Sequence, residues 1–110
     1  MQGIKIDILK GQLELVVLAS LRDGPRHGYA IIKELRERSG GELDVLEGTL
    51  YPALHRLEQS GLIKSRWATA GGRRRRVYEL TRRGSKALRE KESQWRSFVR
   101  TLNDVLGGAS

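Results

Sequence analysis

The sequence contains no cysteine, which excludes disulfide bonds and metal sites built on thiolates. Its two histidines, His27 and His55, are 28 residues apart, and no pair of carboxylates accompanies them. Glycine pairs such as Gly71-Gly72 have the composition of turns, and no Walker-type phosphate loop is present. We therefore expect no catalytic set, no metal site and no cofactor, and we predict that the protein is not an enzyme.

Long apolar runs are also missing. The longest one is Leu15–Ala19, far short of the roughly 20 residues that span a bilayer. Residues 1–10 lack the apolar stretch of a signal peptide, so we expect a cytoplasmic protein with no membrane association. Aromatic residues make up only 5% of the chain, so aliphatic side chains must form most of the core. Such a thin core indicates a subunit that gains stability by association.

Positive charge is abundant and concentrated in one segment. The net charge of the chain is +8. Between Lys64 and Lys91 there are eleven basic residues and two acidic ones, a net charge of +9, so the remaining residues sum to −1. A localised positive field of this kind favours a polyanionic partner, nucleic acid above all, although a merely solvated basic surface is the simpler alternative.

At 110 residues the chain is long enough for one core. Apolar residues at helical spacing predict a first helix over residues 8–22, ended by Asp23-Gly24-Pro25, and a second from about His27 to residue 39. A third helix is predicted from about Glu47 or Gly48 to residue 60, with Pro52 tolerated in its first turn. This arrangement is typical of a helix-turn-helix.

Two extended segments, residues 62–68 and 73–80, surround a glycine turn and predict a β-hairpin. Ile63, Tyr78 and Leu80 alternate with charged residues and should face the core, whereas the four arginines at 73–76 should project into solvent. A hairpin placed directly after a helix-turn-helix is a wing. The predicted fold is mainly α with a small β-hairpin (α+β), a winged helix-turn-helix over residues 1–81.

The last predicted helix runs from Arg82 to Leu106, with Thr81 as its N-cap and residues 107–110 as a tail. A helix of about 25 residues is about 37 Å long, more than the rest of the domain can cover. Its apolar stripe predicts a C-terminal dimerisation helix over residues 82–106 that packs on a second copy; the alternative folds it wholly onto its own subunit. The predicted interface residues are Leu13, Val17, Leu88, Trp95, Phe98, Val99, Leu102 and Leu106.

Several motifs in register resemble one known family. They are LKGQLEL at 9–15, GPRHGY at 24–29, EGTLYPALHRLE at 47–58, GLI at 61–63, GRRR at 72–75 and YELTRRG at 78–84. The sequence resembles the PadR family of bacterial transcriptional regulators over residues 9 to about 106, and its single C-terminal helix is similar to the compact subgroup. The resemblance implies a winged-helix homodimer that represses transcription from a palindromic DNA operator. In many members it also implies release by a small aromatic effector.

The predicted DNA-binding residues are Tyr29, Thr49, Tyr51, His55, Arg56, Gln59, Arg73 and Arg74. His55 and Gln59 lie on the outward face of the third helix, where they could read bases in the major groove. For Tyr29 the alternative is a place in the core, for Tyr51 it is packing against the second helix or the wing, and for His55 it is an ordinary exposed position. Arg73 and Arg74 are nearest the tip of the wing and should contact the DNA backbone or the minor groove.

Trp95 lies on the stripe of the last helix, where it either stacks a flat effector or simply packs at the interface. A different class of function is a winged-helix interaction module whose basic wing binds an acidic protein. The polar, hydrogen-bonding face of the third helix argues instead for DNA. RNA ranks lower because exposed aromatic side chains for base stacking are few.

Overall fold

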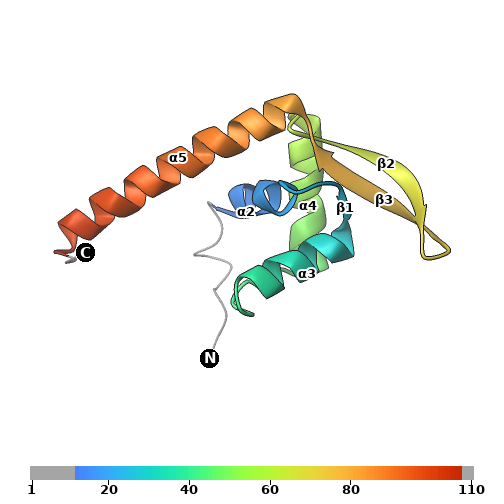
Figure 1. Ribbon diagram of the computed structural model, residues 1–110, viewed down its shortest axis with the longest axis horizontal. Helices are drawn as coiled ribbons and strands as arrows, with labels where there is room; N and C mark the ends of the chain where they lie inside the picture. Colours follow the sequence, from blue (N-terminus) through green and yellow to red (C-terminus); the bar gives the residue numbers. More distant parts are fainter. Residues whose placement is uncertain (1–11, 108–110) are drawn as a thin grey trace.

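The computed structural model describes residues 12–107, and within them the chain forms four helices and a three-stranded antiparallel sheet (Figure 1). The elements are α2 (Leu13–Ser20), β1 (Arg26–His27), α3 (Gly28–Arg38), α4 (Glu47–Gln59), β2 (Ile63–Ala70), β3 (Arg73–Leu80) and α5 (Arg82–Val105). The helical residues predicted at 8–11 and the tail at 108–110 lie outside the described residues. None of these four helices is long and apolar enough to cross a membrane.

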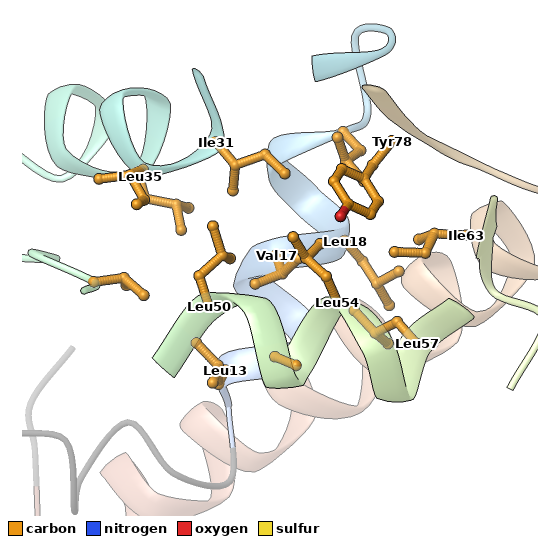
Figure 2. Packing of buried hydrophobic residues seen from close by; sticks show 14 of the residues in the cluster. Leu13, Val17, Leu18, Ile31, Leu35, Leu50, Leu54, Leu57, Ile63 and Tyr78 are labelled. Carbon is orange, nitrogen blue, oxygen red and sulfur yellow. The ribbon is translucent and has the colours of Figure 1, made fainter. Parts of the chain in front are cut away.

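Helices α2, α3 and α4 pack around one apolar core, and the sheet closes one side of it (Figure 2). The largest completely buried side chains are aliphatic: Val17, Leu18, Leu21, Ile31, Leu50, Leu54, Leu57 and Ile63. Tyr78 of β3 is the only aromatic residue in the described part of this core. Ile63 and Tyr78 face the core as the alternation of the hairpin predicted. The winged helix-turn-helix fold is confirmed.

Strand β1 was not predicted from the sequence. Arg26 and His27 pair with Tyr78 and Val77 of β3, which makes β3 the central strand in the order β1-β3-β2. Two residues are too few to produce a recognisable alternation, so only the tertiary pairing defines this strand.

The position of Pro52 in α4 also differs from the prediction. The helix begins at Glu47 as expected, but Pro52 is then its sixth residue and lies in the second turn rather than the first. Because proline has no N–H, the carbonyl of Gly48 has no helical hydrogen-bond partner at this point.

The hairpin is longer than predicted and has a tighter turn. Strand β2 continues to Ala70, so that only Gly71 and Gly72 form the loop. Their φ angles of 60° and 76° are those of a two-residue hairpin turn that favours glycine at both positions. This turn fixes the register of the whole wing and places Trp67 opposite Arg76.

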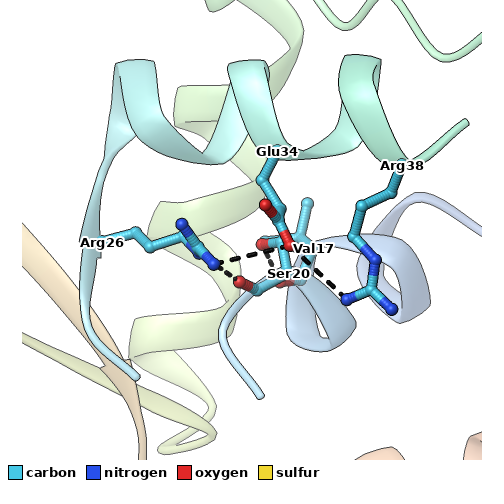
Figure 3. Close-up of polar contacts among 5 residues, drawn as sticks. All are labelled: Val17, Ser20, Arg26, Glu34 and Arg38. Atoms are coloured by element: carbon cyan, nitrogen blue, oxygen red, sulfur yellow. Dashed lines mark hydrogen bonds and ion pairs between the residues drawn. The ribbon is translucent and has the colours of Figure 1, made fainter. Parts of the chain in front are cut away.

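A partly buried polar cluster fixes β1 against the helices (Figure 3). The Nε of Arg26 donates a 2.8 Å hydrogen bond to the carbonyl of Ser20 at the end of α2, and its guanidinium lies 3.4 Å from Glu34 of α3. Glu34 is also 3.4 Å from Arg38, and the hydroxyl of Ser20 donates to the carbonyl of Val17. The start of α3 is therefore held at a fixed angle to α2.

The junction between the wing and α5 is closely packed. The hydroxyl of Thr81 accepts a hydrogen bond from the N–H of Gly84 and donates one to the carbonyl of Gly61, at 3.0 and 2.7 Å. Thr81 is thus the N-cap of α5, as predicted. A Cβ atom at Gly84 would overlap the carbonyl of Leu62, so this helix begins in direct contact with the backbone that joins α4 to β2.

Helix α5 runs past α2, with Glu92 2.8 Å from Arg22, and its far end then extends beyond the body of the domain (Figure 1). Only Gly84 and Leu88 are buried among its residues, whereas Phe98 and Val105 are 53% and 76% exposed. The alternative in which α5 folds wholly onto its own subunit is therefore wrong.

Burial also corrects three of the predicted interface residues. Leu13, Val17 and Leu88 are only 6%, 0% and 3% exposed and pack in the core of their own subunit, so they offer a partner very little surface. Their helical spacing was correct, but that pattern does not distinguish a side chain that packs within the subunit from one that packs on a second copy.

We expect Gly84→Ala to lower the free energy of unfolding by about 1–3 kcal/mol, because the new methyl group must displace backbone rather than a flexible side chain. Gly48→Ala in α4 is the matched control, since no atom lies within 4 Å of its Cβ position and alanine favours a helix. Urea denaturation at one protein concentration measures both. Equal stability of the two variants would contradict the tight junction.

Candidate nucleic-acid interface

Helix α4 presents a polar face opposite its buried one. Leu50, Ala53, Leu54 and Leu57 point into the core. On the opposite side His55 and Gln59 are both exposed, and Gly48, which has no side chain, and Pro52 lie near them. The structure therefore brings two of the predicted base-reading residues together on an accessible face of the helix.

Tyr51 lies on the side of α4 that faces the wing. Its phenol oxygen rests against Gly28, where a Cβ atom would overlap the ring, and 39% of the residue remains exposed. The alternative of packing against α3 is therefore confirmed for one edge of this ring. Glu58, further along the same side, accepts a 2.7 Å hydrogen bond from Ser65 of β2.

Arg56 and Thr49 lie on the other flank of α4, toward α2. The Nε of Arg56 is 3.8 Å from a carboxylate oxygen of Glu14, and Thr49 is half-buried. The structure does not place these two side chains on the face formed by His55 and Gln59. The side chain of Arg56 is nevertheless 55% exposed and open to a ligand at the edge of that face.

The start of α3 contributes a second group of residues. Tyr29 is 58% exposed, so its alternative placement in the core is wrong. The carboxylate of Glu47, through hydrogen bonding and its charge, raises the pKa of the Tyr29 phenol. His27 caps the helix, because its Nδ1 accepts a hydrogen bond from the N–H of Ala30 at 3.2 Å. Burial, and then the charge of Arg75, lower the pKa of His27 and favour the neutral form that can accept this bond.

The wing completes a cationic cleft beside these residues. Arg73, Arg74 and Arg76 are exposed on β3 and Arg75 is half-buried. Because side chains alternate along a strand, Arg73 and Arg75 share one face of the wing, and Arg74 and Arg76 share the other. A cleft of about 370 Å³ between the wing and the starts of α3 and α4 is lined by Tyr29, Tyr51, Trp67 and the arginines at 73–76.

Trp67 was missed by the sequence reasoning. It is 54% exposed on β2, and the guanidinium groups of Arg74 and Arg76 lie 5.2 and 5.5 Å from the centre of its ring. Recognising Gly71-Gly72 as a two-residue turn would have predicted the pairing of Trp67 with Arg76, since that turn sets the register.

A second surface lies between α2 and α5. Trp95 borders two grooves of about 620 and 590 Å³, which also involve Leu15 and other residues of these two helices. The ring of Phe98 is 5.8 Å from that of Trp95, centre to centre. Both aromatic side chains are exposed, so they form an apolar patch where α5 passes α2.

The fold and the cationic cleft agree with one family of proteins. The family model described as "Transcriptional regulator PadR-like family" matches residues 17–90, from α2 into α5. The chain belongs to the PadR family. It is similar to the transcriptional regulator Rv3488 of Mycobacterium tuberculosis, with 40% identity over 101 residues that cover 92% of this chain and 89% of that protein.

Solved structures of PadR-like regulators have the same architecture. A transcriptional regulator from Clostridium thermocellum aligns with a TM-score of 0.82 and 32% identity, covering 92% of this chain and 96% of that one. A PadR family regulator from Eggerthella lenta aligns with a TM-score of 0.80 and 35% identity, covering 92% and 87%. PadR-family members are DNA-binding transcriptional regulators and not enzymes, so this chain acts in DNA-binding regulation.

Proposed function

We propose that this PadR-family regulator represses transcription as a homodimer bound to a palindromic operator. The apolar second half of α5 carries the proposal. Its exposed side chains are Trp95, Phe98, Leu102, Val105 and Leu106. A contiguous apolar surface of this kind on a soluble domain is unfavourable in water and marks a binding surface. A second copy of the same helix offers a matching stripe, and a two-fold pair buries both.

In the proposed complex α4 enters the major groove, with His55 and Gln59 against base edges. In this complex the phenol O–H of Tyr29 turns away from Glu47 and donates a hydrogen bond to a backbone phosphate near the start of α3. Arg73 and Arg74 follow the neighbouring backbone from the tip of the wing. The remaining predicted contacts, Thr49, Tyr51 and Arg56, lie on the flanks of α4 and position the helix in the groove.

Two-fold symmetry of the protein requires two-fold symmetry of the site. The two copies of α4 would meet half-sites in consecutive major grooves, about 34 Å apart. Two half-sites related by this symmetry form a palindromic DNA sequence. We propose that the operator overlaps the promoter, so that the bound dimer excludes RNA polymerase and represses transcription.

The direct test compares a duplex from the region upstream of the protein's own gene with a scrambled duplex of equal length. We expect the wild type to sediment as a dimer, to prefer the upstream duplex at least tenfold, and to lower expression of a reporter placed behind it. The variant Phe98→Glu/Leu102→Glu should sediment as a monomer and lose that preference, because charges cannot be buried unpaired between two helices.

Ser97→Glu is the matched control, since Ser97 is exposed on the side of α5 opposite the apolar stripe. It should leave both the dimer and the preference unchanged. Lone protomers of the wild type together with equal binding to both duplexes would overturn the proposed function.

The proposed contact between the wing and DNA phosphates predicts how the affinity for DNA depends on salt concentration. Each phosphate neutralised contributes about 0.9 to the slope of log affinity against log salt. We expect Arg73→Ala/Arg74→Ala to reduce the slope by about 1.8, measured by fluorescence anisotropy between about 50 and 200 mM salt. Lys86→Ala/Arg89→Ala removes the same charge from exposed positions on α5 and should reduce it less. An unchanged slope in the wing variant would contradict the contact.

We further propose that a small flat aromatic effector binds beside Trp95 and releases the protein from DNA. The support is an exposed aromatic ring that borders two grooves, in a region the dimer would enclose.

In a Trp67→Phe variant, Trp95 is the only tryptophan, so its fluorescence reports this site alone. We expect saturable quenching by some members of a panel of flat aromatic compounds. The same compounds should weaken binding to the upstream duplex by about tenfold or more. If no compound in a broad panel quenches Trp95, this residue has a packing role only.

A further inference from the structure

We propose that Trp67 is a positioning residue for DNA binding, which holds the guanidinium group of Arg74 toward the cleft between the wing and the start of α4. This inference rests on the proposed contact of the wing with DNA, and it concerns a residue that does not itself supply a charge.

The ring of Trp67 contacts two cations on the inner face of the wing. Arg74 and Arg76 lie 5.2 and 5.5 Å from its centre, within the roughly 6 Å over which a guanidinium is attracted to an aromatic face. The register explains this arrangement, because Arg76 is directly opposite Trp67 and Arg74 is two residues closer to the tip on the same face.

The two arginines differ in their other partners. The Nε of Arg76 donates a 2.9 Å hydrogen bond to the hydroxyl of Ser65, and its guanidinium is 3.9 Å from Glu58 of α4. Within residues 12–107 no carboxylate pairs with Arg74. The charge of Arg76 is therefore partly neutralised and fixed to α4, whereas Arg74 keeps its charge for a ligand and depends on the ring for its position.

The ring of Trp67 also links the guanidinium of Arg74 to helix α4. Trp67 contacts Arg76, and Arg76 is bound through Ser65 and Glu58 to α4. An arginine held in this way loses less conformational freedom when a phosphate binds than an arginine free in solvent. The core needs no aromatic side chain at this position, since Trp67 lies on the wing and is more than half exposed.

A double-mutant cycle tests the proposal. Binding to a labelled duplex of scrambled sequence, about 30 base pairs long, isolates the phosphate contacts, because these dominate non-specific affinity. We expect Trp67→Ala to weaken binding roughly three- to tenfold, in line with one or two cation–π contacts. In an Arg74→Ala background the same change should have less than about a twofold effect, because the residue acts through Arg74.

Two conservative variants separate a positioning role from bulk packing. Trp67→Tyr keeps an aromatic face and should retain most of the affinity, whereas Trp67→Leu keeps an apolar side chain without one and should behave like Trp67→Ala. Arg73 provides the matched control for the cycle. It lies on the opposite face of β3, so its change to Ala should add to that of Trp67→Ala without coupling.

Additive effects of Trp67→Ala and Arg74→Ala, or full affinity of Trp67→Leu, would overturn the role of Trp67 while the wild type still binds DNA. Failure of the wild type to bind either duplex would instead overturn the proposed function and this inference with it. Thermal unfolding of each variant checks that the exposed position tolerates the change.

Discussion

The contact between Gly84 and the backbone at Leu62 determines the direction of α5 relative to α4 and the wing. Thr81 bonds to the residues on both sides of this contact, so the wing, the end of α4 and the start of α5 meet at one rigid point. The direction of α5 is set there, before any of its apolar residues is reached. Since the proposed partner binds on α5, the distance between two copies of α4 depends on this junction.

The side of the domain that carries the proposed DNA interface combines rigid and accessible groups. His27 caps α3 in its neutral form, Arg26 ties β1 to α2, and Glu58 fixes Arg76 against α4. These interactions hold His27 and Arg76 in place at the edge of the cleft. His55 on α4 and Arg74 on the wing are both exposed, so in the proposed complex a nucleic acid would meet side chains on a rigid support.

Much of this architecture could be predicted from the sequence. Helical spacing and breaker residues located the four described helices, and the alternation of Ile63 and Tyr78 identified the inner face of the hairpin. The features that were not predicted depend on tertiary contacts. Strand β1 exists only because β3 pairs with it, and Trp67 acquires its neighbours only through the register that Gly71-Gly72 imposes.

The predicted interface shows the same limit. A periodic apolar stripe indicates which residues share a face of a helix. It does not indicate whether that face packs on the core of the same subunit or on another chain. Leu88 and Phe98 belong to one stripe of α5, yet the first is buried by α2 and its neighbours and the second is exposed. The division falls where α5 passes beyond the domain, and only the three-dimensional arrangement reveals that point.

The length of α5 has a mechanical consequence. A helix of 24 residues is about 36 Å long, and it is anchored firmly at one end. It acts as a lever arm, because a tilt of about 5° near its anchor carries its far end through about 3 Å, by the geometry of a rigid rod of that length. In the proposed dimer, small adjustments in the grooves between α2 and α5 would therefore be amplified into changes in the spacing of the two copies of α4, which a DNA duplex of fixed helical repeat would not tolerate.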